Sequence, residues 1–433
     1  MSGLASFHYD GVAIDVGRAT VSCHYSIGDQ RFEETLRIPE GDLGAPGVAQ
    51  AATLYFLFAG VSYLKTSMPL LVDLGATATS RAEREVLTSF FIDGLGEFAL
   101  RNSLDLRGLE LTGPVAEPAP VALEVDLGRL LIPFGGGLDS IVTVAELAPL
   151  ADDAALFVVE RPGARFDAIE RPAALTGLEV VRAERAIDEK VLHSTKHGYL
   201  NGHVPVTGII SAIAVLSALA TGRGAVAMSN ERSASSATTE GPGGPVNHQW
   251  SKGIDFERGF RSLLAARLPG VEYFSWLRDR SELSIAERFA GLESYHLAFR
   301  SCNRAFHQDP ARRAARWCGI CDKCLFIDLV LAPQLSRERL NEIFDGVEPL
   351  ENPALVDQLA VLVGSSQATR PFECVGDVDE CRQALLTLAN RDDRRSNETV
   401  QRLASSLTDV ITPAEPPPCG LIPERYAARA RLV

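Results

Sequence analysis

The sequence lacks the features that would place the protein on a membrane or on nucleic acid. Its formal net charge is −14 over 433 residues, which argues against broad electrostatic attachment to nucleic acid or to an anionic membrane. The first ten residues have no basic stretch followed by an apolar run, so no secretory signal is expected. The uncharged apolar run Val48–Leu64 is shorter than the roughly 20 residues that cross a bilayer. We therefore expect a cytoplasmic protein, with this run as a buried helix.

Disulfides are not expected, because four of the eight cysteines crowd into one short stretch of a protein expected in the reducing cytosol. Their spacing is C-x15-C-x2-C-x2-C, and four thiolates at such spacings can close a tetrahedral zinc site. The alternative is a set of buried free thiols, one of which acts as an acid or a base. The candidate metal ligands are Cys302, Cys318, Cys321 and Cys324.

The periodicity of apolar residues predicts an α/β protein with three parts. Strand-like runs between residues 7 and 36 and a helical run at 50–64 predict an α+β domain over residues 1–118. A Pro- and Ala-rich linker at 112–120 leads to residues 119–335, where alternating strands and helices predict a parallel sheet. Residues 336–433 are predicted to be mainly helical, with an extended Pro-rich tail. The predicted elements of the last two parts are strands at 130–134, 155–159, 178–181 and 225–228, helices from Ser140 and at 206–219, 325–331, 336–344 and 382–388, and the tail Pro413–Pro418.

A glycine turn is the central motif. The apolar strand ending at Phe134 runs into three glycines and then into a helix. Consecutive glycines let the backbone approach an anion closely, and the helix N-terminus directs free N–H groups and a positive dipole end toward it. The turn lacks the lysine of a Walker motif and the third glycine of a dinucleotide fingerprint. The alternative is a plain tight turn. The residues predicted to bind phosphate or its metal are Gly135, Gly136, Gly137, Asp139 and Ser140.

This turn resembles the S-G-G-x-D-S loop of the ATP pyrophosphatase superfamily, with Gly135 in place of the first serine and one hydroxyl contact to pyrophosphate lost. The resemblance implies an ATP pyrophosphatase-like catalytic domain that splits ATP between its α- and β-phosphates to activate a carboxylate. The cysteine run is similar to that of 7-cyano-7-deazaguanine synthase, another member of the superfamily. That similarity implies a structural Zn²⁺ ion at the four cysteines.

Polar side chains gather in four segments near predicted strand ends or helix starts, at 201–207, 229–233, 247–252 and 274–283. Ligands bind at this rim in an open α/β sheet. The alternative is that these residues cap helices and turns, and that Arg278 is an ordinary surface arginine. The predicted substrate-binding residues are Asn201, His203, Asn230, Arg232, Asn247, Gln249, Ser251, Arg278 and Glu282.

These motifs together resemble one family, the UDP-N-acetylmuramoyl-L-alanyl-L-glutamate epimerases of peptidoglycan synthesis, or MurL. The resemblance covers residues 130–333 and extends weakly to P-F-E-C-V-G at 371–376. The motifs that carry it are the glycine turn, N-G-H-V-P-V-T from Asn201, S-N-E-R-S-A from Ser229, V-N-H-Q-W-S-K from Val246, S-W-L-R-D-R-S-E-L from Ser275, S-C-N-R from Ser301 and W-C-G-I-C-D-K-C from Trp317.

The resemblance implies that the terminal L-glutamate of UDP-MurNAc-L-Ala-L-Glu is inverted to D-glutamate, with ATP and Mg²⁺ used and AMP and pyrophosphate released. The chemistry needs this activation, because an α-proton beside a carboxylate anion is very weakly acidic, whereas the mixed anhydride made by adenylation can accept the charge. A tuned side-chain base can then remove the proton. We nominate His248, Glu231 and Lys252 for proton transfer, with Arg232 or Arg278 as partner of a carboxylate or phosphate.

Two other functions remain open at this stage. One is a different carboxylate-adenylating ATP pyrophosphatase that forms a nitrile or an amide, or that thiolates tRNA, although the acidic net charge argues against tRNA. The other is a zinc-stabilised nucleotide-binding protein without turnover. The N-terminal domain is expected to help hold the long substrate. The sequence does not indicate an oligomeric state.

Overall fold

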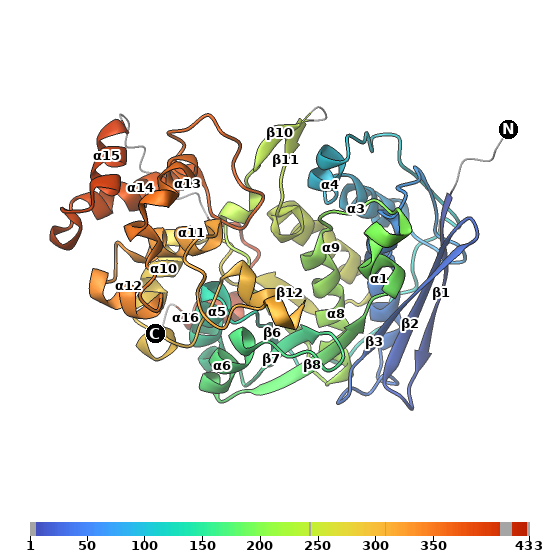
Figure 1. Ribbon diagram of the computed structural model, residues 1–433. Helices are drawn as coiled ribbons and strands as arrows, with labels where there is room; N and C mark the ends of the chain where they lie inside the picture. Colours follow the sequence, from blue (N-terminus) through green and yellow to red (C-terminus); the bar gives the residue numbers. More distant parts are fainter. Residues whose placement is uncertain (1–5, 242–243, 308, 408–417, 431–433) are drawn as a thin grey trace.

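The computed structural model describes residues 6–241, 244–307, 309–407 and 418–430, and in these ranges ten strands form one sheet (Figure 1). The strand order is β12-β9-β6-β7-β8-β3-β2-β1-β4-β5. The strands are β1 (Ser6–Asp15), β2 (Thr20–Ile27), β3 (Gln30–Arg37), β4 (Leu71–Asp73), β5 (Glu110–Thr112), β6 (Arg129–Pro133), β7 (Asp153–Glu160), β8 (Glu179–Ala186), β9 (Ala225–Met228) and β12 (Glu272–Ser275); β10 (Thr239–Gly241) and β11 (Gly244–Val246) pair separately as a hairpin.

The five strands from β12 to β8 are parallel to one another. The chain leaves β6 toward β7 and β8 on one side and later places β9 and β12 on its other side. Strand order therefore reverses between β6 and β9. Such a reversal leaves a crevice at the carboxyl ends of the two strands. The predicted parallel strands are confirmed, and the glycine turn lies at this crevice.

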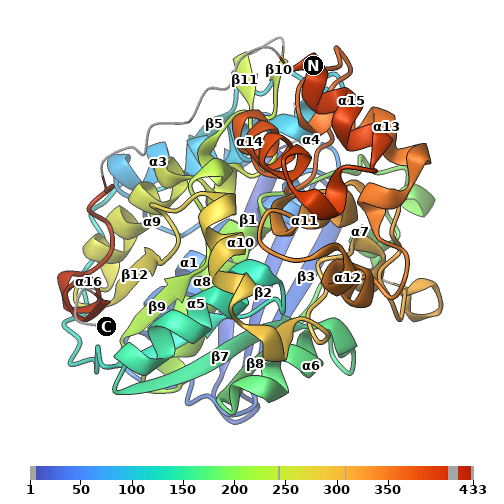
Figure 2. The ribbon, with the colours of Figure 1, turned by 90° about the vertical axis from the view of Figure 1, so that its left-hand side faces the viewer.

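Side chains of the parallel strands alternate between two cores, one on each face of the sheet. Leu131 and Val226 join the core that contains α1 (Val48–Ala59), α8 (Val206–Ala220) and α9 (Ile254–Arg267). Leu130, Ile132 and Ala227 join the core that contains α5 (Leu138–Leu147), α10 (Glu282–Ala290) and α11 (Asp322–Leu331). This period-two alternation explains why the strands are apolar throughout, since both faces are covered (Figure 2).

The predicted helix at 50–64 is confirmed as α1 and α2 (Val61–Leu64), which are buried almost throughout. The two helices meet at Gly60, where a Cβ atom would lie 2.3 Å from the hydroxyl oxygen of Tyr9. Across the described ranges, each helix is too short or too polar to span a membrane.

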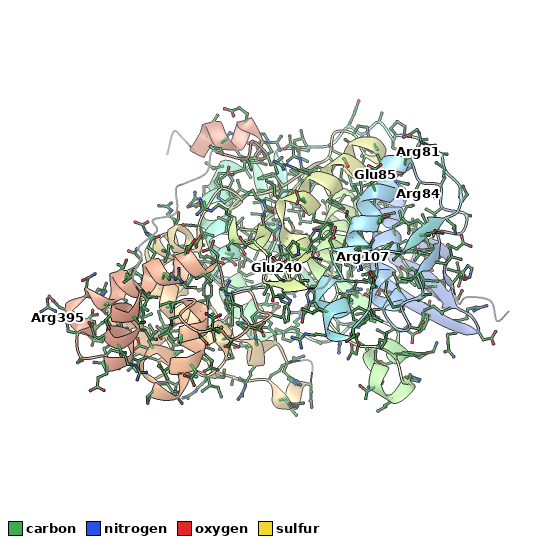
Figure 3. All side chains as sticks on the ribbon, turned by 90° about the horizontal axis from the view of Figure 1, so that it is seen from above. Arg81, Arg84, Glu85, Arg107, Glu240 and Arg395 are labelled. Atoms are coloured by element: carbon green, nitrogen blue, oxygen red, sulfur yellow. The ribbon has the colours of Figure 1, made fainter. Side chains whose placement is uncertain are left out.

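The C-terminal region is mainly helical, as predicted, and its residues 337–406 pack beside α10 and α11 (Figures 1 and 2). The last helix lies apart from these and contacts β12 through the Arg425–Glu272 ion pair. Residues 413–417 of the predicted tail lie outside the described residues. Earlier in the chain, Arg84, which Figure 3 labels on α3 (Arg81–Ile92), donates hydrogen bonds to the carbonyls of Leu111, Gly113 and Pro114. These bonds hold the start of the predicted linker against α3. The other helices are α3 (Arg81–Ile92), α4 (Gly96–Arg101), α6 (Asp167–Thr176), α7 (Glu189–Leu192), α12 (Arg337–Ile343), α13 (Val356–Leu362), α14 (Val378–Ala389), α15 (Glu398–Ser406) and α16 (Glu424–Ala430).

A buried ion pair joins the N-terminal strands to the parallel strands. β3 pairs antiparallel with β8, so the sheet runs across the predicted limit between residues 118 and 119. At this seam Arg185 donates to both oxygens of Glu34, at 2.8 and 3.0 Å. The hydroxyls of Tyr55 and Tyr63 donate to the same carboxylate at 2.5 and 2.9 Å. Every Glu34 oxygen is thus hydrogen-bonded, which offsets the cost of burying the charge.

We predict that Arg185→Leu lowers the free energy of unfolding by roughly 3–5 kcal/mol, because it leaves the Glu34 carboxylate buried without its cation. Urea unfolding at pH 7 measures the loss. The matched control is Arg37→Ala, which removes the exposed ion pair to Glu184 between the same two strands and should cost about 1 kcal/mol or less. Equal losses in the two variants would contradict this account.

Candidate active site

The glycine turn has a conformation that its sequence requires. Gly136 has φ +72°, and a Cβ atom there would lie 2.3 Å from the carbonyl oxygen of Ala168. Gly137 precedes the first residue of α5, and a Cβ atom there would lie 3.0 Å from Oγ of Ser301. The Ser140 hydroxyl donates to the Gly137 carbonyl at 3.0 Å. The turn is therefore packed tightly on its protein side, while the space around Gly135 is open.

A pocket of about 420 Å³ lies over this turn, at the carboxyl ends of β6, β7 and β9. Its position is the crevice expected where strand order reverses. One part of its wall is polar and includes Asp139, Asn230 and Lys252. The remainder is largely apolar and includes Phe157, Val158, Val159, Ile169, Ile210, Met228 and Phe306. A polar end beside an apolar slot suits a ligand with a charged and an aromatic part.

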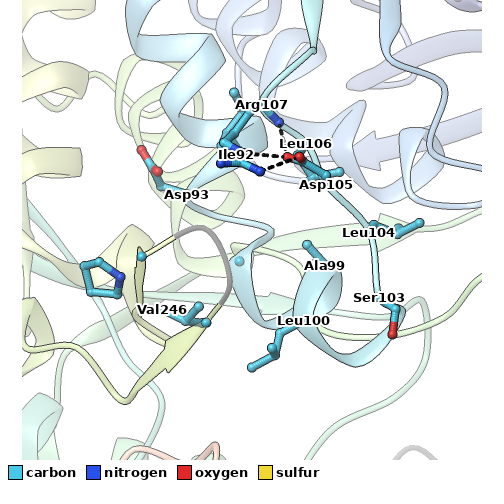
Figure 4. A pocket seen from close by; sticks show the side chains of 14 residues that line it. Ile92, Asp93, Ala99, Leu100, Ser103, Leu104, Asp105, Leu106, Arg107 and Val246 are labelled. Carbon is cyan, nitrogen blue, oxygen red and sulfur yellow. Dashed lines mark hydrogen bonds and ion pairs between the residues drawn. The ribbon is translucent and has the colours of Figure 1, made fainter.

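A second pocket, of about 450 Å³, lies between α4 and the β10–β11 hairpin (Figure 4). Two of its charged side chains, Asp105 and Arg107, pair with each other at 2.6 Å. No glycine turn, lysine or histidine lines it among the described residues. Although this second pocket is slightly larger, it has fewer side chains that could bind phosphate or transfer a proton than the pocket at the glycine turn has. We therefore take the pocket at the glycine turn as the candidate site.

Charged side chains concentrate at the polar end of the candidate site. Burial, followed by the neighbouring Glu231, raises the pKa of Asp139 to about 6. Lys323 and Lys252 act in the opposite direction and lower this pKa. Glu231 is 2% exposed, and its Oε2 has no hydrogen-bond partner among the described residues. Burial, followed by Glu231 and Asp139, also raises the pKa of Glu282. Burial and the repulsion between neighbouring carboxyl groups therefore make the charged forms of Asp139 and Glu282 costly.

Cys374 is a residue of this site that we did not predict. The Lys252 Nζ lies 3.4 Å from its Sγ, and His248 forms a hydrogen bond with the same thiol. Burial raises the pKa of the thiol, but Lys252 and the hydrogen bond from His248 lower it to about 7. Lys323 also lowers this pKa, and Glu231 raises it. A thiol with two cations and an imidazole beside it is a reactive thiol, unlike a buried one in apolar surroundings.

His248 connects this thiol to the N-terminal part of the chain. Its Nδ1 lies 2.5 Å from Oε2 of Glu97 on α4, and Arg101 pairs with the same carboxylate at 2.6 Å. Burial works to lower the pKa of His248, but Cys374 and Glu97 raise it to about 9. The ring of His203 packs on that of His248, with 4.4 Å between centroids, and burial lowers its pKa to about 4. His248 is thus cationic at neutral pH, and His203 is neutral.

Other predicted substrate-binding residues mainly contact the protein. Arg278 is 3% exposed and donates to Glu257 at 2.8 and 3.0 Å, to the Glu231 carbonyl at 2.9 Å and to the Lys252 carbonyl at 2.6 Å. It therefore positions the backbone of two nominated catalytic residues. The Asn201 side chain accepts a hydrogen bond from Lys65 at 3.0 Å.

The remaining residues of the set lie nearby but in varied roles. Asn230 lines the pocket and donates to Ser275 at 3.0 Å. Asn247 donates to the Ala234 carbonyl at 2.8 Å and accepts from the backbone of Gln249 at 2.7 Å. Their roles as substrate ligands stay predictions. Of the others, Oε1 of Gln249 is buried without a partner in the described structure, Ser251 is buried, Arg232 lies 3.5 Å from Glu380, and Glu282 accepts from Ser233 at 3.3 Å.

The four clustered cysteines converge, and their Sγ atoms all lie within 4.8 Å of one another. Two of the separations are 3.7 Å (Cys318–Cys324) and 3.3 Å (Cys321–Cys324). A tetrahedron with metal–sulfur distances of 2.3 Å has edges of about 3.8 Å, so the donor set fits a zinc ion. Gly319 has φ +67°, which turns the chain between two of the ligands. Cys302 follows Ser301, which contacts the glycine turn.

Sequence reasoning missed Cys374 and Glu97 for different reasons. Cys374 belongs to the P-F-E-C-V-G motif, which was a signal, but the thiol is 122 residues from Lys252. Glu97 lies in a region without recognised motifs, 151 residues from its partner His248. Residues so far apart in the chain share no local sequence pattern that could predict their contact. The nominated residues His248 and Lys252 do come together, through Cys374.

Comparison with known proteins settles the family. A model described as the MurL N-terminal domain matches residues 1–276, and one described as the MurL C-terminal domain matches residues 298–416. The chain belongs to the MurL family. His248 and Lys252 lie in the region matched by the N-terminal MurL model and Cys374 in that matched by the C-terminal model, so the candidate site combines both regions.

Three curated MurL relatives resemble almost the whole chain. They come from Xanthomonas oryzae pv. oryzae (35% identical, 95% of this chain and 91% of the relative), Micromonospora sp. (36%, 98% and 97%) and Salinispora tropica (35%, 98% and 94%). Each is named UDP-N-acetyl-alpha-D-muramoyl-L-alanyl-L-glutamate epimerase. Epimerases are isomerases, so the family resemblance of the sequence is confirmed. No solved structure matches the chain significantly.

We predict that Gly136→Ala lowers the free energy of unfolding by at least about 1–2 kcal/mol, because alanine is strained at positive φ and its Cβ would collide with the Ala168 carbonyl. Urea unfolding measures the change. Gly135→Ala is the matched control in the same turn, and because its Cβ would enter open space it should change stability by about 0.5 kcal/mol or less. A stable Gly136→Ala variant would show that the turn is not constrained in this way.

Proposed function

We propose that the protein is an ATP-dependent epimerase that inverts the terminal L-glutamate of UDP-MurNAc-L-Ala-L-Glu to D-glutamate in peptidoglycan synthesis. Membership of the MurL family supports the substrate and the reaction class. The observation that carries the ATP chemistry is the glycine turn, which opens on a pocket at the point where strand order reverses. The predicted cytoplasmic location suits an enzyme that consumes ATP.

The pocket has the features that ATP needs. The amides of the glycine turn and the N-terminus of α5 suit phosphate oxygens, and the apolar wall suits an adenine ring. Asp139, in the first turn of α5, is the residue that would hold Mg²⁺. The neighbouring Glu231, whose Oε2 has no hydrogen-bond partner among the described residues, supports this proposal, because it adds a second carboxylate near Asp139. Bound Mg²⁺ would neutralise phosphate charge there.

Adenylation explains why such an enzyme would need ATP. Removal of the α-proton from free glutamate would place a second negative charge beside the carboxylate. In the mixed anhydride the carboxylate charge is gone, and the acyl carbonyl accepts the electron pair of the broken C–H bond. Return of a proton to the opposite face inverts the centre, and hydrolysis restores the carboxylate and releases AMP. The side chains nominated for proton transfer are His248, Glu231 and Lys252.

We also propose that the four clustered cysteines hold a structural zinc ion, since all four thiols face one another and leave no position for a substrate. Their segment carries Ser301, which packs against the turn at Gly137. The metal would thereby fix the segment that supports the glycine turn.

We predict that incubation with ATP, Mg²⁺ and UDP-MurNAc-L-Ala-L-Glu in D₂O yields D-glutamate that carries deuterium at the α-carbon, together with AMP and pyrophosphate. Chiral analysis, mass spectrometry and nucleotide chromatography measure the three products. Asp139→Asn should lower AMP release at least about tenfold, because the Mg²⁺–phosphate contact is weakened.

Each rival function gives a different result in this experiment. AMP release without α-deuterium would point to a nitrile- or amide-forming ATP pyrophosphatase, which would be recognised by its ammonia-dependent product. Binding of ATP without AMP or deuterium would leave a nucleotide-binding protein without turnover. Either outcome would contradict the proposed epimerase.

We predict one zinc ion per chain, and loss of zinc together with a lower melting temperature in Cys302→Ser. Elemental analysis and thermal unfolding measure the two effects. Cys419→Ser is the control, because Cys419 lies outside the cluster and should leave both values unchanged. Wild-type zinc content in Cys302→Ser would exclude this residue as a ligand.

A further inference from the structure

We propose that Cys374 is a catalytic residue that transfers the α-proton on one face of the activated glutamate, with His248 and Glu97 as the groups that position it and relay its proton. The inference rests on the proposed adenylation and deepens it, since none of the side chains first nominated for proton transfer is a thiol. Four features of the structure support it: the fixed loop, the link to the nucleotide pocket, the relay, and the contrast with other thiols.

The loop that carries Cys374 is held in place from three directions. Lys323 donates to the Cys374 carbonyl. Arg370 donates to the carbonyls of Val375 and Gly376, at 3.3 and 3.0 Å. The guanidinium of Arg101 on α4 lies over the ring of Phe372, 5.0 Å from its centroid. These contacts hold the loop so that the partly buried thiol lies beside Lys252 and His248.

Lys252 places the thiol beside the nucleotide pocket. The lysine lines that pocket, and its Nζ is also the atom 3.4 Å from Cys374 Sγ. An acyl group attached to the α-phosphate would therefore extend from the pocket toward this sulfur. The same ammonium can stabilise the negative charge that develops on the acyl oxygen when the proton leaves. Only the Lys252 side chain thus separates the thiol from the part of the pocket where we expect the α-carbon of the activated glutamate.

The relay allows the thiol to recover after each turnover. In the thiolate form, Cys374 takes the α-proton to become a thiol, and the C–H electron pair moves into the acyl carbonyl. A second acid supplies the proton that enters the opposite face. Protonation of Cys374 removes an anion that raises the pKa of His248, so the imidazolium releases a proton toward Glu97 and solvent. The neutral imidazole can then accept the thiol proton, and the second acid regains its proton from solvent, so no net proton is consumed. In the reverse reaction the two faces exchange roles.

Electrostatics at the site favours the thiolate. The cations that face the sulfur are Lys252, Lys323 and the protonated His248, and the opposing anion is Glu231. A thiol pKa of about 7 lies near physiological pH, where a general base works best. The α-exchange rate should therefore rise as pH increases through about 7, because the thiolate forms there.

Cys381, seven residues later, shows that burial alone does not produce this state. Its thiol is fully buried and points to the Val375 carbonyl at 3.8 Å. Burial raises the pKa of this thiol well above its ordinary value. The two cysteines differ in their neighbours, because Lys252 and His248 contact Cys374 but not Cys381. A structural cysteine would not need them.

We predict that Cys374→Ser lowers α-deuterium incorporation by roughly 10²–10⁴-fold while isotope exchange between ATP and pyrophosphate, which reports adenylation alone, changes by less than about threefold. Cys419→Ser is the matched control and should leave both rates unchanged. Wild-type α-exchange in Cys374→Ser would overturn the proposal. Absence of ATP–pyrophosphate exchange in the wild type would instead overturn the proposed adenylation.

A second measurement does not depend on turnover. The rate of alkylation by iodoacetamide at residue 374, followed by peptide mass spectrometry, should show a midpoint near pH 7. Glu97→Gln and His248→Gln should raise this midpoint, because each weakens the imidazolium beside the thiolate. A midpoint near the ordinary thiol value of about 8.5 in the wild type would also overturn the proposal.

Discussion

The site depends on one ammonium group, the Nζ of Lys252. It lies between the pocket at the glycine turn and the Cys374 thiol, and its charge is set against Asp139 and Glu231 as well. Burial works to lower the pKa of Lys252, but these anionic neighbours raise it above its ordinary value. A buried cation is stable only when anions surround it, and buried carboxylates need cations in the same way. Lys252 therefore stabilises the charged forms of the thiol and of Asp139, and these anions stabilise the ammonium, although the anions repel one another.

The fold brings these groups together from three parts of the chain. Reversal of strand order at β6 and β9 creates the crevice, and the glycine turn after β6 lines it. The segment with His248 and Lys252 follows the β10–β11 hairpin, while Cys374 arrives from the helical C-terminal region. Arg278 donates hydrogen bonds to the carbonyls of Glu231 and Lys252 and so fixes these two segments relative to each other. A loss of docking between the regions matched by the two MurL models would separate the Cys374 thiol from Lys252 and His248.

Much of the fold could be predicted locally. The strands at 130–134 and 225–228 and the helix at 206–219 are recognisable, because strands buried on both faces are continuously apolar and helices are longer. Within the polar segments predicted at the rim, Asn230 and Lys252 line the candidate pocket. The pairing of β3 with β8 could not be predicted, since the Arg185–Glu34 pair joins residues 151 positions apart. The buried ion pair between Arg278 and Glu257 could not be predicted either, because the two residues are 21 positions apart.

From the sequence we could recognise the glycine turn, the clustered cysteines, the order of the elements and the resemblance to the MurL family, because each depends on residues that are close in the chain or on a motif. The titratable groups that lie beside one another became evident from the three-dimensional contacts. The pKa of Cys374 is set by Lys252 and His248, and that of His248 by Cys374 and Glu97. Electrostatic interactions depend on distance in space and on burial, and neither quantity is written in the spacing of residues along the chain.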